Sequence, residues 1–153
     1  MWEELNSTPL VIDGQDVADR IKAGRYDWVH PDIDNQNFTP SLLGADVYTF
    51  YLFHPRQADK LANEAAVAEP CGLKPATIEV VLAVGVHFPD KQKSFPIIGS
   101  GATCWLRRPY VSREGEYRVC LDQAGQLRTL SLVPADSPFY PPTRWLYYRR
   151  GRR

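Results

Sequence analysis

GLKPATIEVVLAVGVHFPDKQKSFPIIGSG, the stretch from residue 72 to residue 101, contains the signals that decide the fold. Its first part has Thr77 as a candidate N-cap, a run rich in Ile, Val and Leu over residues 78–84 and Gly85 as a candidate C-terminal stop. The β-branched content of that run would suit a strand, but the two end signals favour a helix. In the second part, Pro96 and the glycines around Ser100 frame a short strand. The stretch therefore predicts a helix that precedes a run of strands.

Beyond residue 95 the pattern changes to the period of two that is typical of half-buried strands. Turn-forming residues separate the pieces at Pro109, Gly115 and Gly125. We expect short strands at residues 97–100, 117–121, 126–132 and 144–148.

Ahead of this stretch the sequence predicts a short helix, a strand and another helix. Asp13 is the expected N-cap of the first helix and Gly24 its left-handed stop. An extended segment follows, which we expect Trp28 to anchor, and then a loop over residues 31–44.

Residues 47–53 are apolar on both alternating faces, which indicates a strand buried on both sides. Pro55 suits the first turn of the next helix, which should end before Pro70. These elements predict one α+β domain, with short helices followed by a mainly antiparallel, twisted sheet. Its parts are residues 1–70 with the N-terminal helices and strand, residues 71–148 with a helix and antiparallel strands, and a basic tail at residues 149–153.

The composition is that of an ordinary globular protein, and its charge favours no class of partner. Of 153 residues, 44% are hydrophobic, and 18 Lys and Arg balance 18 Asp and Glu. A nucleic-acid or membrane partner would therefore need a local basic patch. The acidic residues Glu3 and Glu4 stand where a signal peptide would be basic, and no apolar run approaches the ~20 residues that span a bilayer. We expect a cytoplasmic protein with no membrane partner.

The cysteines, Cys71, Cys104 and Cys120, have neither the spacing of a metal site nor an even number. We expect three buried, reduced thiols. The alternative is one disulfide and one free thiol.

The order of these motifs resembles that of a group of bacterial proteins of unknown function. The resemblance covers about the last half of the chain and rests on Gly72-Leu73-Lys74-Pro75-Ala76-Thr77-Ile78-Glu79, Phe95-Pro96-Ile97-Ile98-Gly99-Ser100 and Arg144-Trp145-Leu146-Tyr147-Tyr148-Arg149. The layout is also similar to that of bacterial domains with a C-type-lectin-like fold, in which a helix precedes a twisted antiparallel sheet. The resemblance implies that fold for the second half. It implies no particular function, because such folds carry sugar-binding, protein-binding and catalytic surfaces.

Residues with catalytic or metal-binding chemistry form no recognisable motif. The polar run over residues 32–37 lacks the glycine of a calcium loop, and we interpret it as a turn. A dyad of His87 with Cys104 or Cys120 is left open, because catalytic neighbours need not be close in sequence. The sequence thus predicts no catalytic residue, metal or cofactor. Each histidine remains a candidate general base: His30, His54 and His87.

Two clusters of arginines and aromatics are candidate binding surfaces. In the C-terminal cluster, residues 144–153, arginines could pair with phosphates and aromatics could stack on bases. Its plainer interpretation is a last strand with Trp145 and Tyr147 buried and a solvated basic tail. The second cluster lies in what the resemblance would make the long-loop region, where C-type-lectin-like domains usually bind ligands. Its alternative interpretation is a strand end with exposed arginines. The predicted ligand-binding residues are Trp105, Arg107, Arg108, Tyr110 and Arg113.

The leading hypothesis is a non-catalytic binding module for a protein or small ligand. It rests on the basic-aromatic cluster together with the absence of a recognisable catalytic motif in the sequence. One alternative is a hydrolase-type enzyme that uses a Cys/His site. Another is a nucleic-acid accessory protein that uses the basic C-terminus.

Overall fold

The computed structural model describes residues 2–12, 16–40, 46–55, 68–107, 113–136 and 142–151. Its α-helices are α1 (Val17–Gly24) and α3 (Ile78–His87), with short 3₁₀ helices η1 (Glu69–Cys71) and η2 (Lys91–Lys93). Its strands are β1 (Trp2–Glu4), β2 (Leu10–Ile12), β3 (Trp28–Val29), β4 (Asp46–Phe53), β5 (Lys74–Pro75), β6 (Ile97–Leu106), β7 (Gly115–Ala124), β8 (Leu127–Pro134) and β9 (Arg144–Arg150).

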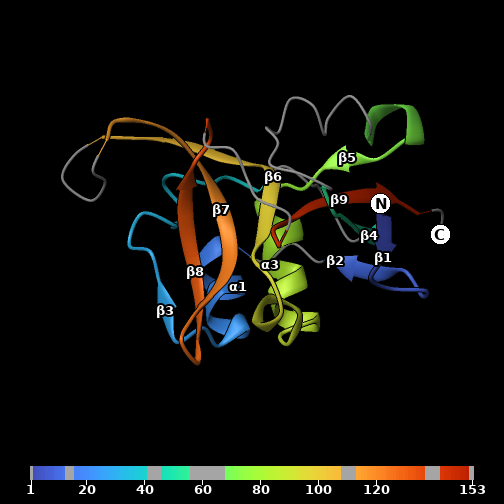
Figure 1. Ribbon diagram of the computed structural model, residues 1–153, viewed down its shortest axis with the longest axis horizontal. Coiled ribbons are helices and arrows are strands. Elements are labelled where there is room, and N and C mark those ends of the chain that lie inside the picture. The colour runs from blue at the N-terminus through green and yellow to red at the C-terminus, as the bar shows by residue number, and fades with distance from the viewer. Residues whose placement is uncertain are drawn as a thin grey trace.

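The described strands form one mixed sheet in the order β1-β4-β9-β6-β7-β8-β3, with β2 added to β4 and β5 added to β9. Most neighbours are antiparallel, whereas β6 with β9 and β3 with β8 are parallel. Because β4 lies beside β9, the N-terminal and C-terminal parts of the chain share the sheet (Figure 1). The α+β prediction is confirmed, and the sheet is mixed.

β9 is buried on both faces of the sheet, and it separates two apolar clusters. Successive residues of a strand point to opposite faces. Accordingly, Leu146 and Tyr148 pack in the larger core with α3, while Trp145 and Tyr147 pack with Leu73 in a second cluster. The helices α1 and α3 lie together on the side of the larger core (Figure 1). The burial of Trp145 and Tyr147 agrees with the sequence prediction.

The FPIIGSG motif covers residues 95–101, and its two glycines allow β6 to pass close to α3 and to the segment around Ala76. A Cβ on Gly99 would collide with Val81 of α3, and one on Gly101 would lie 3.1 Å from the Ala76 carbonyl oxygen. Between them, the Ser100 hydroxyl donates to the Leu146 carbonyl (2.6 Å) and accepts from the Ala76 N–H (3.1 Å). The motif is therefore the point where β5, β6, β9 and α3 meet.

β6 is longer than predicted and changes its register at this motif. Ile98 pairs with Cys120 and Thr103 with Arg118, so β6 uses five residue steps where β7 uses two. The extra residues form a bulge that bends the strand, and the end of β6 then extends with β7 as a hairpin away from the helices (Figure 1). β7, β8 and β9 also extend beyond their predicted limits.

The helix predicted over residues 78–84 is present, but its end signals act differently. Thr77 occupies the N-cap position, yet its side chain makes no capping hydrogen bond. Gly85 is not the stop, since α3 continues to His87. A Cβ at Gly85 would collide with the hydroxyl of Tyr26, so glycine is required here for packing.

The end signals predicted for α1 are each displaced. Asp16 is the N-cap, and its carboxylate accepts the Asp19 N–H at 2.8 Å, while Asp13 lies outside the described residues. The left-handed residue is Arg25 (φ 51°) rather than Gly24. Trp28 is part of an extended segment, but it does not anchor the core, because 47% of its surface is exposed.

The remaining predictions for the N-terminal and C-terminal parts have mixed outcomes. β4 covers the predicted strand and is fully buried on one face only, at Tyr48, Phe50 and Leu52. Most of the helix predicted after Pro55 lies outside the described residues. The basic tail was predicted to begin at Arg149, but Arg149 and Arg150 belong to β9.

Candidate functional site

The candidate site lies where β6, β7 and the end of β8 approach one another. Alternation along β6 places Ala102, Cys104 and Leu106 in the core, so that Thr103 and Trp105 point to solvent. Trp105 is 61% exposed, which is unusual for the largest side chain in a position supported by a buried strand.

A cavity of about 510 Å³ adjoins Trp105. Its lining comes from β6, from the residues that lead into β7, from β7 itself and from the turn after β8. The lining residues are Trp105, Arg113, Glu114, Gly115, Glu116, Tyr117, Arg118, Ala135 and Asp136.

The charges around the cavity are arranged in pairs. Glu114 Oε1 lies 3.3 Å from Arg107 Nε and accepts from the Trp105 indole N–H at 3.4 Å. Arg113 Nη2 lies 2.7 Å from Asp136 Oδ1, and this ion pair connects the segment before β7 with the turn after β8. The paired charges leave the rim close to neutral, and surface pairs of this kind contribute at most about 1 kcal/mol each to stability.

Arg118 is the most constrained charge of the site. Its guanidinium donates to the Ala135 carbonyl at 2.8 Å and lies 3.5 Å from Glu116. Burial lowers the pKa of this guanidinium, and the neighbouring Glu116 acts in the opposite direction. Tyr117 below it is buried and donates its hydroxyl to the Arg113 carbonyl at 2.5 Å. These bonds connect β7 with Arg113 before it and with Ala135 after β8, and together they form the floor of the cavity.

The structure brings together part of the predicted ligand-binding set. Trp105 and Arg113 line the cavity. Arg107 is exposed and forms an ion pair with Glu114, which also lines the cavity. Arg108 and Tyr110 lie outside the described residues. The sequence prediction missed the acidic partners and Arg118. Alternation along residues 115–121 could have placed Glu116 and Arg118 on the face of Trp105, but only with the hairpin register known.

The histidines and cysteines do not form the dyad that the sequence left open. His87 is exposed at the end of α3, whereas Cys104 and Cys120 are buried. Burial raises the pKa of the Cys104 thiol to about 11, and burial also raises that of Cys120, so both thiols stay protonated at neutral pH. The prediction of three buried thiols is wrong for Cys71, which is exposed, and the three are free.

His30 occupies a structural position in the loop after β3. Its Nδ1 accepts the Asp32 N–H at 3.1 Å, and the same nitrogen lies 3.9 Å from Asp32 Oδ2. The polar run that follows forms turns, with Asp34 Oδ1 accepting from the N–H groups of Gln36 and Asn37. Within the described part of the chain, no group of three or more His, Cys, Asp or Glu side chains is placed to hold a metal ion.

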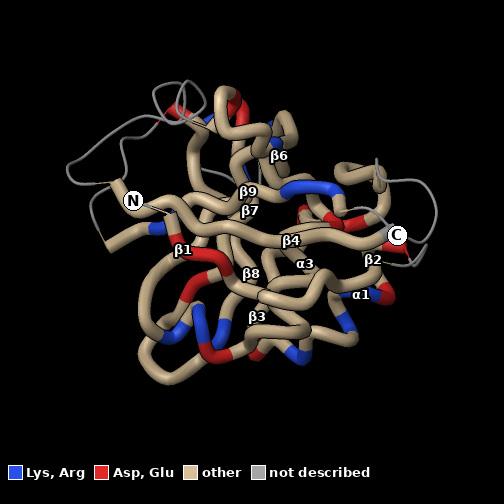
Figure 2. The backbone as a smooth tube through the Cα atoms, turned by 90° about the vertical axis from the view of Figure 1, so that its right-hand side faces the viewer, with Lys and Arg blue, Asp and Glu red and all other residues tan. Residues whose placement is uncertain are grey.

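The basic end of β9 is partly engaged by the protein itself. Arg149 donates to the Cys71 carbonyl at 2.7 Å, and its guanidinium lies 5.5 Å from the centre of the Tyr51 ring. Basic and acidic residues are interspersed along the described backbone rather than separated onto different sides (Figure 2).

Among the described residues, the helices are all too short or too polar to cross a membrane. In comparisons with known proteins, no family model matches the chain, and it matches neither a curated protein nor a solved structure.

Proposed function

We propose that the protein is a non-catalytic binding module and that the surface around Trp105 recognises a protein or small ligand. The observation that carries the proposal is the exposed indole of Trp105 beside a cavity of about 510 Å³. Large aromatic side chains contribute much of the binding energy at interfaces when a partner covers them. The residues on either side of Trp105 are buried, so the backbone that carries the indole is already ordered before a partner covers it.

The charges of the site favour an uncharged or internally balanced ligand. Arg107, Arg113 and Arg118 each have a carboxylate within 3.5 Å, so a strongly anionic ligand would have to displace these partners. This argues against nucleic acid as the ligand of this surface, because such binding depends on unpaired cationic groups.

The hydrolase alternative has less support than the binding module. A thiol nucleophile needs a lowered pKa and a neighbouring base, whereas the buried Cys104 and Cys120 have raised pKa values. The nucleic-acid alternative would rest on Arg149 and Arg150, of which Arg149 already binds a carbonyl.

The finer fold and the location predicted from the sequence belong to the same proposal. A C-type-lectin-like second half is supported by the order of α3 followed by the strands β6 to β9. A cytoplasmic location is supported by the three free cysteines.

The proposal can be tested through the indole N–H signals of the four tryptophans in two-dimensional NMR spectra. Each signal is assigned by a single Trp→Phe variant, and a library of small molecules and short peptides is then titrated. We expect ligands that shift the Trp105 signal and lose affinity in Trp105→Ala. Trp28→Ala is the matched control, since Trp28 is also exposed but lies outside the cavity lining. The proposal fails if Trp105 and Trp28 respond equally, or if the Trp105 signal responds to nothing in the library.

A further inference from the structure

Among the described strands, none pairs with the outer edge of β6 next to Trp105. On the side away from β7, β9 pairs with Ile97–Gly99 only, and the Gly101 N–H then donates to the Ala76 carbonyl at 2.8 Å. From Ala102 to Leu106, no strand of the described chain pairs with this edge. The ladder therefore stops while β6 continues.

The hydrogen bonds of the neighbouring strands define which backbone groups face this edge. The Glu116 carbonyl accepts from the Ala135 N–H at 2.9 Å, so the backbone of Glu116 faces β8. In an antiparallel ladder, the N–H and C=O of one residue point to the same side. Trp105, opposite Glu116, is thus in a non-hydrogen-bonded pair with β7, and its own N–H and C=O face outward.

The same alternation applies to Thr103, which is opposite Arg118 and two residues from Trp105. Gly101 has this parity too, and its outward N–H is the group bound by Ala76. Thr103 and Trp105 together present two N–H and two C=O groups, in the pattern of one further strand.

In the described part of the chain, the open edge rests on the core and lacks the usual protection of an edge strand. Ala102, Cys104 and Leu106 hold it from below in the apolar core, while the side chains of Thr103 and Trp105 remain exposed. Proteins usually protect an open edge with proline, lysine or a bulge at that position. Residues 102–106 contain no proline or lysine, and the bulge of β6 lies before Thr103.

We propose that β6 binds an extended peptide of a partner protein, which adds to the sheet as a strand along Thr103 and Trp105. The proposal rests on the proposed function of the Trp105 surface and names its partner class. Only an extended backbone offers alternating donors and acceptors at the spacing of this edge. The peptide residue opposite Trp105 projects to the same face as the indole, so an apolar or aromatic residue is expected there.

A second copy of this chain would fit the hydrogen bonds but not the size of a stable interface. A two-fold pairing centred on Cys104 would join Thr103 of one copy to Trp105 of the other. The short edge from Ala102 to Leu106 would bury much less surface than the roughly 800 Å² per partner that specific interfaces bury. A peptide has no second globular body to place, and the paired charges of Arg107 and Arg113 favour one without large net charge.

The test uses the full chain and an acetylated, amidated heptapeptide without net charge, Lys-Thr-Val-Xaa-Val-Thr-Glu, in which Xaa is Trp, Leu or Ala. Two further versions of the best binder carry N-methyl groups on one or the other alternate set of residues. Only one set of peptide N–H groups faces β6, so one methylated version should lose binding and the other should retain it. Binding should also slow hydrogen exchange at the Thr103 and Trp105 amides.

Thr103→Pro removes one outward donor without touching the β6–β7 ladder, and Thr103→Ala is the matched control that keeps the N–H. We expect roughly tenfold weaker binding for the proline variant and little change for the alanine variant. If the proline variant does not fold, the methylated peptides decide alone.

Three results would overturn the inference: equal binding of both methylated peptides, no binding of any heptapeptide at millimolar concentration, or Thr103 and Trp105 amides that are protected without peptide. Protection that rises with protein concentration would identify a second copy as the occupant. A ligand that shifts the Trp105 indole signal without protecting the two amides would preserve the proposed function and remove only the strand addition.

Discussion

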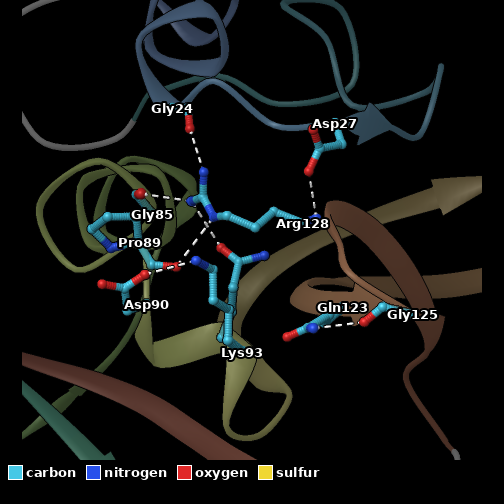
Figure 3. Close-up of polar contacts among 10 residues, drawn as sticks. Gly24, Asp27, Gly85, Pro89, Asp90, Lys93, Gln123, Gly125 and Arg128 are labelled. Carbon is cyan, nitrogen blue, oxygen red and sulfur yellow. Dashed lines mark hydrogen bonds and ion pairs between the residues drawn. The ribbon is translucent and has the colours of Figure 1, made fainter.

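The guanidinium of Arg128 lies over the ring of Tyr26, 4.9 Å from its centre. From this position it donates to the Gly24 carbonyl at 2.7 Å, the Gly85 carbonyl at 2.9 Å and the Pro89 carbonyl at 3.1 Å (Figure 3). Gly24 is the last residue of α1 and Gly85 lies in the last turn of α3. A cation is favourable at the negative end of a helix dipole. One side chain of the β7–β8 hairpin therefore fixes the ends of both helices against the sheet.

Replacing Arg128 with alanine should lower the free energy of unfolding by about 2–3 kcal/mol, because several carbonyls lose a charged donor at once. Urea denaturation would measure the change. Arg149→Ala is the matched control, since Arg149 also binds a carbonyl and lies over a tyrosine ring but is exposed. Its loss should be below about 1 kcal/mol. Equal losses in the two variants would contradict the role assigned to Arg128.

Gly85→Ala should destabilise the protein, although alanine in a helix interior normally gains about 1 kcal/mol over glycine. The added Cβ would collide with the Tyr26 hydroxyl and lie 2.9 Å from its Cζ. We expect a loss of about 1–3 kcal/mol in thermal or urea unfolding.

The double variant with Tyr26→Phe identifies the cause of that loss. Removing the hydroxyl should recover part of the stability, which would appear as a coupling energy in a double-mutant cycle. Gly115→Ala is the control, because nothing lies within 4 Å of a Cβ at that position. If Gly85→Ala proves as neutral as Gly115→Ala, the packing explanation is wrong.

The order of elements in the second half could be predicted from the sequence, because it depends on local signals. Thr77 and the apolar run after it predicted α3, and alternation predicted parts of β6 to β9. Gly85 was misinterpreted, since a packing glycine and a helix-stop glycine look the same without the position of Tyr26. Trp28 was misplaced for a related reason: its exposure depends on β3 being the edge of the sheet, and pairing order is a property of the whole chain.

Only part of the candidate site could be predicted from the sequence. Trp105 and Arg113 stand out as an aromatic and a cation in a segment without a strong helix or strand signal. Glu116 and Arg118 come from β7 and Asp136 from the turn after β8, and they come close to Trp105 only through the hairpin register. The open edge of β6 depends on which strands do not pair, and no residue type in the sequence signals that.

Stability should fall as the pH drops through the ordinary pKa of histidine, near 6.5, and His30 should cause part of the fall. Burial lowers the pKa of His30, with Asp32 acting in the opposite direction. Because the unfolded chain binds the proton at a higher pH than the folded protein, protonation favours unfolding. Protonation would also remove the bond that Nδ1 accepts from the Asp32 N–H.

Urea unfolding at about pH 7.5 and about pH 5.5 separates this contribution from those of other groups. His30→Gln should lose less stability between the two pH values than the unmodified protein does. The matched control is His87→Gln, which makes the same substitution at an exposed histidine. Identical pH dependence in His30→Gln and the unmodified protein would exclude the contribution of His30.

In the native protein, a thiol reagent should modify Cys71 alone. The thiolate is the reacting species and the reagent must also reach the sulfur. Cys71 is exposed, whereas Cys104 is buried with its pKa raised to about 11, and Cys120 is buried with its pKa also raised. Mass spectrometry after brief labelling should show one modified thiol, none in Cys71→Ser, and all three after unfolding in urea. Labelling of Cys104 at a rate close to that of Cys71 would mean that the β6–β7 hairpin, which also carries the open edge and Trp105, separates from the core in solution.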